Sequence, residues 1–553
     1  MLHPARKPSK MRQLILMPPM LSKSLSKPAI STAPLPGLRL RVPRLCVAVQ
    51  GDTPAELLER AEAATADSKF LEFRLDALKK PAEAARKVQE FLGEHRDVMA
   101  IATCRRKAYG GSFAGSLTEE LSVLQAAAEA GCKIVDLEVE SAEEAGPRAL
   151  EKFREALRAA GTALLISFHD FTHTRNLGQV ATRIEAFRPD FVKLVSTAKT
   201  LADNLAVLKL IEERSLSAQV VGIAMGEEGL LSRVLGPRAG AAFTFAAPSH
   251  GASSDGNVTA PGQVAARTLR DLYRIDQLDR ATQLFGVAGN PITHSLSPLM
   301  HNTAFRKENV NAVLLPLKVR ALSDLLKVVR ELPLVGVAVT MPLKQEILPH
   351  LANPVLPKQV PLTHRIGACN TLRVAADGKI VGFNTDVDGV VRPLEKRLRL
   401  KGARVAVLGA GGAARAAVFG LVDQGAEIYV VNRTHEKAVA LAKEAKAKAL
   451  KHDQLPHHHF DVLINSTPCG MKDSKQALPI AENELNAGLV FDMVYNPLET
   501  PLLKLARERG IPVITGLEMF VQQGARQFEI WTGKPAPEAE MLRVVELELR
   551  RRG

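Results

Sequence analysis

The chain has 553 residues, about three to four times the length of an ordinary domain, so it must contain more than one folding unit. Hydrophobic residues make up 46% and charged residues 24% of it, a composition that excludes collagen-like, coiled-coil and mainly disordered proteins. No apolar run approaches the roughly 20 residues that span a bilayer. We therefore expect a soluble protein of several domains.

The formal net charge of +14 is concentrated near the start of the chain. Residues 1–51 contain nine Lys or Arg and no Asp or Glu, which leaves +5 for everything that follows. A mildly basic remainder suits small anionic substrates. With one Trp and four Tyr, the sequence lacks the interleaved aromatic and basic residues of a single-strand binder, so we expect neither a nucleic-acid nor a membrane partner.

Residues 1–43 mix Pro, Ser, Lys and Arg without a sustained hydrophobic period, which predicts a basic, disordered extension outside the fold. Two interpretations stay open. The segment resembles an organellar transit peptide. A start codon assigned too far upstream would produce the same kind of sequence, and Met11, Met17 or Met20 would then be the true start. We expect a cytoplasmic protein, or a plastid protein if residues 1–43 are a transit peptide.

The five cysteines lie far apart and show no paired spacing of the zinc or redox type, which fits a reducing compartment. A run of three histidines, residues 457–459, follows Pro456 and precedes a strand-like segment, so an exposed loop is favoured over a metal tract. The sequence predicts no bound metal.

From residue 45 onward, short β-rich runs recur roughly every 22–35 residues, with helical patterns between them. Eight such units match a closed (β/α)8 TIM barrel, whose chemistry lies on the loops at the C-terminal ends of the strands. We therefore expect an α/β protein with an N-terminal barrel over residues 44–280. The predicted strands cover residues 45–50, 70–76, 98–104, 133–139, 163–170, 191–197, 219–225 and 241–247.

Polar residues fall at the ends of these strands. Lys193 lies in an apolar strand, where an ammonium group is costly unless it is paired or its pKa is lowered. Such a lysine can form an imine, although an isolated lysine more commonly packs its stem and extends its head into water. His169 ends the preceding strand and could serve the same substrate as general acid and base. Three arginines at the same mouth suit a carboxylate and hydroxyl groups: Arg74, Arg105 and Arg233.

Residues 44–280 resemble a type I 3-dehydroquinate dehydratase, because the motifs LEFRLD, TCR followed by GG, SFHDF, DFVKL, SR and APGQ occur in family order. The resemblance implies that Lys193 forms a Schiff base with the substrate ketone. His169 would assist imine formation and shuttle protons during syn elimination of water, and Arg233 would hold the substrate carboxylate. The remaining substrate contacts would come from Glu72, Arg74, Arg105, Thr259 and Gln263.

Two positions depart from the pattern of this family. Tyr109 stands where the family usually has Glu before the GG pair, so a phenol replaces a carboxylate that would aid proton movement. We expect slower turnover or a shifted pH dependence as a result. Thr259 replaces a serine and keeps its hydroxyl, so we expect little change there.

A different architecture occupies residues 396–516. An apolar strand leads into Gly409, Gly411 and Ala414 in a G-x-G-x-x-A pattern, followed by a helix and a second strand. The glycines allow a tight turn and let backbone N–H groups approach a pyrophosphate at the helix N-terminus. Arg433 follows the second strand, where an acidic residue would favour NAD, so we predict NADP. The alternative is a solvated arginine at a strand end.

Another α/β segment, about residues 283–395, precedes the glycine pattern and has its own polar cluster. Ser295 and Ser297 occupy a turn-rich loop, and Lys344 and Asp386 follow separate predicted strands. A lysine and a carboxylate at strand ends can share a proton and serve general acid–base chemistry, although a surface ion pair is commoner when the two are taken alone.

Residues 283–553 resemble a shikimate dehydrogenase through the ordered motifs NPITHSLSP, VTMPLK, ACNTL, FNTD, GAGGAA, NRT, NSTPCGM, FDMVYNP and GLEMFVQQGA. The resemblance implies a shikimate-binding domain (residues 281–395 and 517–553) and a Rossmann NADP-binding domain (396–516), with Lys344 and Asp386 as the catalytic pair. Ala338 departs from the family, which usually has Asn there. The implied substrate contacts are Ser295, Ser297, Thr340, Asn370, Asp386, Tyr495 and Gln523. The implied cofactor contacts are Gly409, Ala410, Gly411, Gly412, Ala413, Asn432, Arg433, Thr434, Lys437, Met493 and Gly516.

The dehydratase product, 3-dehydroshikimate, is the dehydrogenase substrate, so the two resemblances together imply a fused, bifunctional enzyme. It would convert 3-dehydroquinate to 3-dehydroshikimate and then, with NADPH, to shikimate, in the biosynthesis of aromatic amino acids. Two alternatives are a dehydrogenase half that uses quinate and NAD, and a non-catalytic ligand sensor, because fungal quinate-pathway repressors resemble the same domains. The serine pair and Arg433 favour shikimate and NADP. The joint presence of Lys193, His169, Lys344 and Asp386 favours an enzyme.

Overall fold

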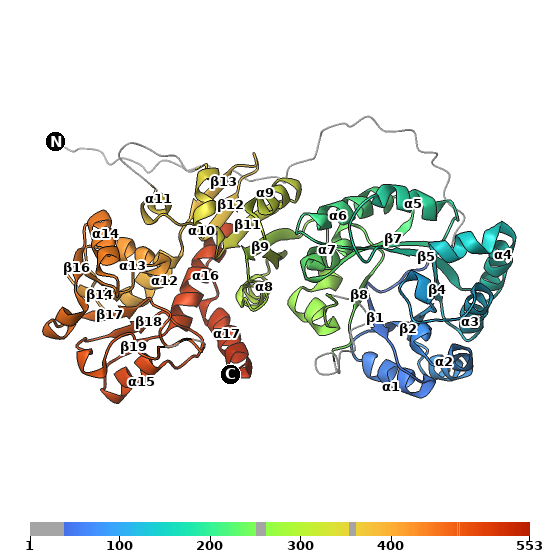
Figure 1. Ribbon diagram of the computed structural model, residues 1–553, viewed down its shortest axis with the longest axis horizontal. Helices are drawn as coiled ribbons and strands as arrows, with labels where there is room; N and C mark the ends of the chain where they lie inside the picture. Colours follow the sequence, from blue (N-terminus) through green and yellow to red (C-terminus); the bar gives the residue numbers. More distant parts are fainter. Residues whose placement is uncertain (1–37, 250–261, 353–360, 473, 475, 553) are drawn as a thin grey trace, which may run out of the picture.

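The computed structural model describes residues 38–249, 262–352, 361–472, 474 and 476–552. The chain forms three bodies in a row, with a barrel at one end, one open sheet in the middle and a second open sheet at the other end (Figure 1). In these ranges, no helix combines the length and the apolar character needed to cross a membrane. The predicted α/β class is confirmed.

The first body is a parallel eight-stranded barrel, as predicted from the recurring β-rich runs. Its hydrogen-bonded order is β7-β6-β5-β4-β3-β2-β1-β8, and β7 and β8 come into contact where the two ends of this ladder meet. The strands are β1 (Leu45–Val49), β2 (Phe70–Arg74), β3 (Met99–Thr103), β4 (Ile134–Glu138), β5 (Ala163–His169), β6 (Phe191–Thr197), β7 (Gln219–Met225) and β8 (Thr244–Ala246). The helices are α1 (Pro54–Ala64), α2 (Ala84–Glu94), α3 (Leu117–Glu129), α4 (Val139–Ala159), α5 (Leu177–Glu185), α6 (Asp203–Arg214) and α7 (Leu230–Ala239).

The local sequence accounts for several of these boundaries. At the start of α3, Ser116 and Glu119 form a capping box, in which each side chain bonds the backbone N–H of the other residue. Every residue of β1 and β4 is buried, because helices cover the outer face of the barrel and side chains fill its interior. A polar side chain in such a strand must therefore find its partners inside the barrel.

Residues 38–43, expected from the sequence to lie outside the fold, contact the barrel. Leu40 and Val42 pack against an apolar cluster of its strands, and the carbonyl oxygen of Leu40 accepts a hydrogen bond of 2.9 Å from Gln219 Nε2. Apolar and basic residues alternate here, so one side of the extended segment packs while the arginines stay exposed. The rest of the predicted extension, residues 1–37, lies outside the described residues.

The middle body is a five-stranded sheet of order β10-β9-β11-β12-β13, in which β12 runs antiparallel to both of its neighbours. Helix α16 packs on α12, and α17 packs on α8. The strands are β9 (Gln283–Gly289), β10 (Ala312–Lys318), β11 (Leu334–Val339), β12 (Thr371–Val374) and β13 (Ile380–Phe383). The helices are α8 (Ser297–Lys307), α9 (Leu322–Glu331), α10 (Leu343–Glu346), α11 (Leu362–Ile366), α12 (Asp386–Glu395), α16 (Gly516–Thr532) and α17 (Glu538–Arg552).

The last body is a parallel six-stranded Rossmann-like sheet of order β16-β15-β14-β17-β18-β19. The strand order reverses between β14 and β17, and ligands of such sheets bind beyond the C-terminal ends of the strands at that point. The strands are β14 (Arg404–Leu408), β15 (Glu427–Val431), β16 (Lys448–Leu450), β17 (Val462–Asn465), β18 (Val490–Asp492) and β19 (Val513–Ile514). The helices are α13 (Gly412–Asp423), α14 (His435–Ala445) and α15 (Pro501–Glu508).

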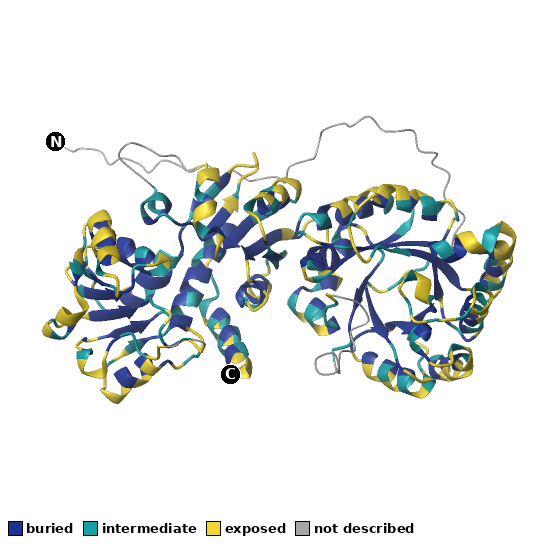
Figure 2. Ribbon diagram, viewed as in Figure 1, coloured by how far each residue is buried: buried dark blue, intermediate teal, exposed yellow. Residues whose placement is uncertain are grey.

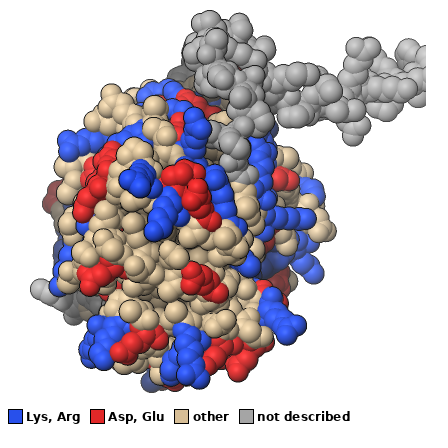
Figure 3. Space-filling view, turned by 90° about the vertical axis from the view of Figure 1, so that its right-hand side faces the viewer, with Lys and Arg blue, Asp and Glu red and all other residues tan. Residues whose placement is uncertain are grey.

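Buried residues concentrate in the strands of all three sheets and on the helix faces that cover them (Figure 2). On the outer end of the barrel, basic and acidic side chains are interspersed (Figure 3), so the net positive charge is not gathered on that face. The three histidines at 457–459 are exposed or half-buried in the segment before β17. Across the described ranges, no group of three or more His, Cys, Asp or Glu residues is placed to hold a metal ion.

Candidate active sites

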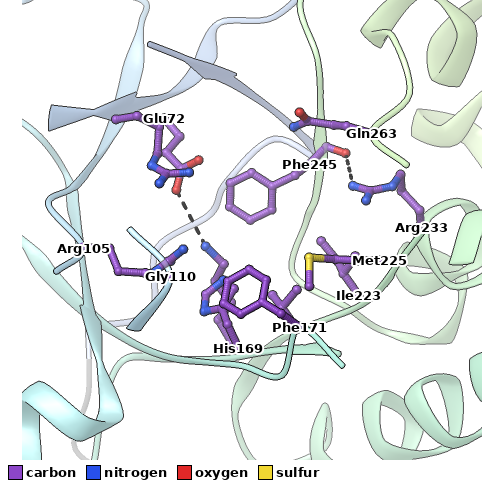
Figure 4. Close-up of a pocket in the computed structure, with 13 residues that line it drawn as sticks. Glu72, Arg105, Gly110, His169, Phe171, Ile223, Met225, Arg233, Phe245 and Gln263 are labelled. Atoms are coloured by element: carbon purple, nitrogen blue, oxygen red, sulfur yellow. Dashed lines mark hydrogen bonds and ion pairs between the residues drawn. The ribbon is translucent and has the colours of Figure 1, made fainter. Parts of the chain in front are cut away.

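The barrel holds a cavity at the C-terminal ends of its strands (Figure 4). The cavity measures about 600 Å³ with its open mouth, which lies in the size range of small-molecule sites. Its lining includes the predicted residues Glu72, Arg74, Arg105, His169, Lys193, Arg233 and Gln263. The sequence analysis did not identify the other lining residues, which are Gly110, Phe171, Val195, Ile223, Met225 and Phe245. Thr259 lies outside the described residues.

Lys193 points into this cavity from β6 and is only 4% exposed. Its Nζ donates a hydrogen bond of 2.7 Å to Asp136 Oδ2, lies 3.7 Å from Glu72 Oε1, and lies 4.4 Å from the centroid of the Phe245 ring. Two carboxylates and an aromatic face offset the desolvation of the ammonium group. The head of this lysine is therefore held inside the cavity and does not extend into bulk water.

Two carboxylates that the sequence analysis missed lie beside Lys193. Asp136 and Glu138 alternate along β4, so both face the barrel interior, and each is 3% exposed. Ser167 Oγ on the neighbouring β5 lies 2.5 Å from Asp136 Oδ1 and 2.6 Å from Glu138 Oε2. The signal was present in the sequence, because two acidic residues two positions apart in an otherwise apolar strand must share one buried face.

His169 contacts the second of these carboxylates. Its Nδ1 lies 2.9 Å from Glu138 Oε1 and 3.1 Å from Oε2, so Nε2 is the ring nitrogen left for a substrate. Burial, together with the nearby Arg105 and Lys193 charges, lowers the pKa of His169 well below its usual value. Burial raises the pKa of Glu138 to about 7. The imidazole is therefore neutral, and a proton held nearby resides on Glu138.

Asp136 behaves differently although it is equally buried. Burial would raise its pKa, but the charges of Lys193 and Arg105 outweigh that effect and hold the pKa below its usual range. Arg105 reaches both carboxylates, with Nη2 3.4 Å from Asp136 Oδ2 and Nε 3.2 Å from Glu138 Oε2. Asp136 is therefore the ionised partner of Lys193, and Glu138 is the carboxyl group that can hold a proton.

Arg233 has no carboxylate partner among the described residues. Its guanidinium is buried and donates one hydrogen bond of 2.9 Å to the carbonyl oxygen of Phe245 (Figure 4), while its Nε has no partner in the described part of the chain. Burial lowers its pKa to about 10, so the group stays positive at neutral pH. In contrast, Arg74 is neutralised by a bidentate contact with Asp76 at 2.8 and 2.9 Å. A buried, unneutralised guanidinium suits an anionic ligand.

Tyr109, the residue that departs from the dehydratase pattern, lies outside the cavity lining. Its ring packs under the Arg106 guanidinium, 5.0 Å from its centroid, on the side of Glu144. Phe171 instead lies over His169, with ring centroids 5.9 Å apart (Figure 4), and its ring packs so closely on Gly110 that an added Cβ there would lie 2.2 Å from it. The cavity is therefore lined next to Tyr109 by the Phe171 ring and by Gly110.

In the middle sheet, Lys344 and Asp386 meet as the sequence predicts. Lys344 Nζ donates a 2.6 Å hydrogen bond to Asp386 Oδ2, and Asn370 Nδ2 donates a 2.9 Å bond to Asp386 Oδ1. The Thr385 backbone N–H donates a 2.8 Å hydrogen bond to Asn370 Oδ1 and so fixes the Asn370 amide. Lys344 and Asn370 therefore each hold one oxygen of the Asp386 carboxylate. Lys344 is 30% exposed and Asp386 14%, which leaves the lysine reachable from solution while its partner is fixed.

The other residues predicted to bind this substrate form two groups, one in the middle body and one where the loop after β18 of the last body meets α16. Ser295 Oγ accepts a 3.3 Å bond from the Ser297 backbone N–H at the start of α8, and Thr340 follows β11 and packs on Gly289, which precedes the serine loop. Tyr495 stacks on Phe520 of α16 with ring centroids 5.1 Å apart, and Gln523 lies one turn further along that helix. Ala338 is buried in β11, and nothing in the structure assigns it a role in binding.

The glycine pattern forms the turn between β14 and α13. Gly409 has φ of 114°, and an added Cβ there would lie 2.6 Å from Ser466 Oγ, so only glycine fits. At Gly411 and Gly412 an added Cβ would meet no atom within 4 Å, so the space beside the backbone is open at the start of α13. This arrangement fits a pyrophosphate. Ala410 and Ala413 lie within the same turn.

The remaining predicted cofactor residues lie beyond the neighbouring strands. Asn432 Nδ2 bonds the carbonyl oxygen of Thr434, and Arg433 and Lys437 are exposed, with no side-chain partner in the described part of the chain. Two free cations after β15 fit a phosphate on the ribose of a dinucleotide. Gly516 starts α16 against the loop after β18, where an added Cβ would lie 2.6 Å from the carbonyl oxygen of Met493.

Family models match four stretches of the chain. They describe the type I 3-dehydroquinase (residues 45–280), the shikimate dehydrogenase substrate binding domain (287–372), the shikimate/quinate 5-dehydrogenase (393–475) and the shikimate 5'-dehydrogenase C-terminal domain (516–546). These matches agree with the order of the barrel and the two sheets.

Individual proteins show the same similarity. A protein of Arabidopsis thaliana, named bifunctional 3-dehydroquinate dehydratase/shikimate dehydrogenase, chloroplastic, is 33% identical over 518 residues, which cover 89% of this chain and 82% of that protein. The shikimate dehydrogenase (NADP(+)) of Maridesulfovibrio salexigens is 41% identical over 260 residues, 45% of this chain and 92% of that protein. A solved shikimate 5-dehydrogenase of Thermus thermophilus, in complex with NADP(H) and shikimate, is 35% identical, covers 49% of this chain and 99% of that chain, and has a TM-score of 0.44.

Proposed function

The chain belongs to the family of bifunctional 3-dehydroquinate dehydratase/shikimate dehydrogenases, and from that premise we propose how its residues carry out two consecutive reactions. The barrel dehydrates 3-dehydroquinate to 3-dehydroshikimate, and the two sheets that follow reduce 3-dehydroshikimate to shikimate with NADPH. The observation that supports the residue assignment is the meeting of Lys193, His169 and Arg233 in one cavity.

In the barrel, Lys193 Nζ gives a proton to His169 and attacks the substrate ketone as the free amine. His169 returns the proton to the hydroxyl, which leaves as water, and the resulting iminium can accept electrons from the neighbouring carbon. Asp136 and Glu72 lie within 4 Å of Nζ, so they stabilise the positive nitrogen of the resting ammonium and again that of the iminium. The substrate carboxylate supplies the anion that Arg233 lacks.

Elimination of water from the iminium requires removal of a proton from one carbon and protonation of the hydroxyl that leaves the next. His169 performs both transfers through Nε2, since its Nδ1 is engaged by Glu138. Arg74, Arg105, Glu72, Gln263 and, outside the described residues, Thr259 hold the remaining polar groups of the substrate. Tyr109 takes no part, because it faces Arg106 and not the cavity.

In the dehydrogenase half, Lys344 and Asp386 act on the oxygen that changes between ketone and hydroxyl. Lys344 donates the proton to this oxygen during reduction, and Asp386, fixed by Asn370, orients the ammonium group. Ser295, Ser297, Thr340, Tyr495 and Gln523 hold the ring substituents of the substrate. An ion pair with no catalytic role would not require the Asp386 carboxylate to be fixed by a second hydrogen bond from Asn370.

NADPH supplies the hydride when it is bound. The turn around Gly409 and Gly411 would hold the pyrophosphate, because the space beside Gly411 and Gly412 is open at the N-terminus of α13. Arg433, Thr434 and Lys437 would hold the 2′-phosphate, and Ala410, Gly412, Ala413, Asn432, Met493 and Gly516 would complete the binding site. The division into residues 44–280, 281–395 with 517–553, and 396–516 is our proposal for the domain boundaries.

A single assay tests both halves. The purified chain is mixed with 3-dehydroquinate and NADPH, and the loss of NADPH absorbance requires dehydration and reduction in sequence. Borohydride added with the substrate should reduce the imine and leave a secondary-amine adduct on Lys193, identified by mass spectrometry. If neither 3-dehydroquinate nor added 3-dehydroshikimate consumes NADPH although both bind, the chain is a ligand sensor and our proposal is wrong.

We propose a cytoplasmic location, with a plastid as the alternative. The Arabidopsis relative is named chloroplastic, and residues 1–43 of this chain are basic and free of acidic residues. Fusing residues 1–43 to a fluorescent protein in the native host separates the two, because a transit peptide would direct the fusion to an organelle.

A further inference from the structure

Glu138 is buried at the back of the barrel cavity, and neither the sequence motifs nor the proposed reaction assigns it a role. It contacts His169 through both carboxyl oxygens, Arg105 Nε at 3.2 Å and Ser167 Oγ at 2.6 Å. The register of the strands places Glu138 of β4, Ser167 of β5 and Lys193 of β6 in one row across the barrel interior. This carboxyl group is therefore positioned behind the imidazole, on the side away from the substrate.

The hydrogen bonds of Ser167 indicate that a proton resides in this row. Its hydroxyl has a single hydrogen, yet Oγ lies 2.5 Å from Asp136 and 2.6 Å from Glu138. If the hydroxyl donates to one carboxyl group, the other must donate to the hydroxyl, which requires a protonated carboxyl. Asp136 also contacts Lys193 Nζ at 2.7 Å and is the ionised one, so the proton belongs to Glu138.

The charges around His169 disfavour an imidazolium. Arg105, two residues after β3, and Lys193 from β6 are close to the ring, and Arg74 from β2 adds a positive charge that Asp76 partly offsets, while Asp136 is the one ionised carboxylate of β4 close by. A histidine that simply took a proton from the substrate would place a new cation among these groups. A base in this position needs a way to pass a proton on.

We propose that Glu138 is a positioning residue that sets the tautomer of His169. When Glu138 is ionised, it accepts the hydrogen bond from Nδ1–H, and the Nε2 lone pair faces the substrate as a base. When Glu138 is protonated, its one proton lies within reach of both Ser167 Oγ and Nδ1; when it turns from Ser167 to Nδ1, Nε2–H faces the substrate as an acid. As Nε2 takes the substrate proton, the Nδ1 proton moves to Glu138. The reverse transfer delivers a proton to the departing hydroxyl, which leaves as water, and no imidazolium forms.

This inference rests on the proposed dehydration in the barrel, and it accounts for the departure at Tyr109. The family pattern usually has a carboxylate at that position, but here the side chain lies under Arg106, outside the cavity. Within the described residues, Glu138 is the carboxyl group that contacts His169. The proton transfers of the barrel therefore depend on β4 and not on the loop after β3.

The first test needs no substitution and no substrate. The wild-type chain is labelled with ¹⁵N in histidine, and the ring nitrogen shifts of His169 are followed across neutral pH, with the signal assigned by its loss in H169Q. We expect the Nε2–H tautomer below about pH 7 and the Nδ1–H tautomer above it, because burial raises the pKa of Glu138 to about 7. A tautomer that stays the same across this range, or a ring that becomes an imidazolium, would overturn the proposal.

The second test compares E138Q with a matched control. An amide cannot take up or release a proton, so E138Q should lower kcat for dehydration by about 10²-fold or more and remove the ionisation near neutral pH from the kcat profile. The KM for 3-dehydroquinate and the borohydride adduct at Lys193 should remain. The control is E120Q, because Glu120 is equally buried with a pKa raised to about 7, but it contacts Arg106 and Ser141 away from the cavity.

The outcomes separate the inference from the proposed function. An E138Q chain that forms the adduct and keeps the wild-type pH profile overturns the role of Glu138 and leaves the dehydratase assignment intact. A wild-type chain that neither dehydrates the substrate nor forms the adduct overturns the assignment itself. If E138Q does not fold, as judged by lost adduct formation together with lost near-ultraviolet circular dichroism, the tautomer measurement on the wild type decides alone.

Discussion

Thr293 Oγ1 donates a 2.7 Å hydrogen bond to Glu227 Oε1, and this bond joins the dehydrogenase loop that carries Ser295 to the barrel turn that follows Met225. The same turn makes ion pairs across the junction, from Glu227 to Lys318 and from Glu228 to Arg320, the latter with Arg320 Nη2 at 2.5 Å. Met225 lines the barrel cavity, and Ser295 belongs to the proposed shikimate site. The contacts between the two halves are therefore made next to both sites.

Reversing the charge of this turn should loosen the arrangement of the two halves without changing either reaction. In E227K/E228K, two ion pairs at the surface are lost, each with one exposed partner (Glu227 and Arg320) and worth only about 0.2–1 kcal/mol, so both halves stay folded, but like charges now face Lys318 and Arg320. We expect a larger radius of gyration by small-angle X-ray scattering, with kcat of each half unchanged. Restoration of the wild-type scattering by K318E/R320E in the same chain is the control, and unchanged scattering in E227K/E228K would refute the prediction.

Replacing Lys193 should separate the two activities. K193M keeps the apolar stem but removes the amine, so dehydration should fall by about 10⁴-fold or more and no borohydride adduct should form. Reduction of 3-dehydroshikimate with NADPH, measured on the same preparation, should be unaffected and serves as the folding control. Equal loss of both activities would indicate a folding defect and not a catalytic one.

The positive charge of Arg233 should be stabilised by the bound substrate more than by the residues around it. Its guanidinium is buried, has one unpartnered nitrogen and lacks a carboxylate partner within the described residues. R233M removes an uncompensated buried charge, so we expect the ligand-free barrel to gain about 1–3 kcal/mol while KM for 3-dehydroquinate rises about 30-fold or more. Chemical denaturation and steady-state kinetics measure the two effects. A variant that loses stability as well as affinity would contradict this account.

Arg433 should decide the choice between NADP and NAD. The side chain is exposed, and within the described residues it has no partner that a substitution would disturb. R433A should raise KM for NADPH by about 10-fold, the value of one charge-assisted contact, and leave KM for NADH nearly unchanged. R330A, which removes an exposed arginine of α9, is the control. A similar effect on both cofactors would argue for a structural role of Arg433.

The barrel should lose stability as the pH rises toward neutrality, in part through Glu120. Burial raises its pKa from the ordinary 4.5 to about 7, so the folded chain holds this proton at a pH where the unfolded chain has released it. The stabilisation is complete below about pH 4.5 and lost above about pH 7, on the order of 3 kcal/mol at most. In E120Q the slope of unfolding free energy against pH should be shallower over this window. An unchanged slope in denaturant titrations would refute this prediction.

The sequence by itself determined the architecture and most of the residues placed in the two sites. Periodic β-rich runs predicted all eight barrel strands, because each strand must bury both faces and so forms a continuous apolar segment. The glycine turn after β14 could be recognised because only glycine tolerates φ of 114° against Ser466. Lys193 and His169 were found because charged groups in apolar strands are conspicuous when strand ends are known to converge.

The tertiary structure alone decided which side chains face one another. Asp136 and Glu138 look like ordinary strand residues until the closed barrel brings β4 beside His169 and Lys193, and Tyr109 leaves the cavity because Arg106 and Glu144 attract it elsewhere. Leu40 and Val42 pack on the barrel although their segment has an unstructured composition. These contacts depend on how close elements far apart in the chain lie in the folded protein, and local periodicity and composition do not determine those distances.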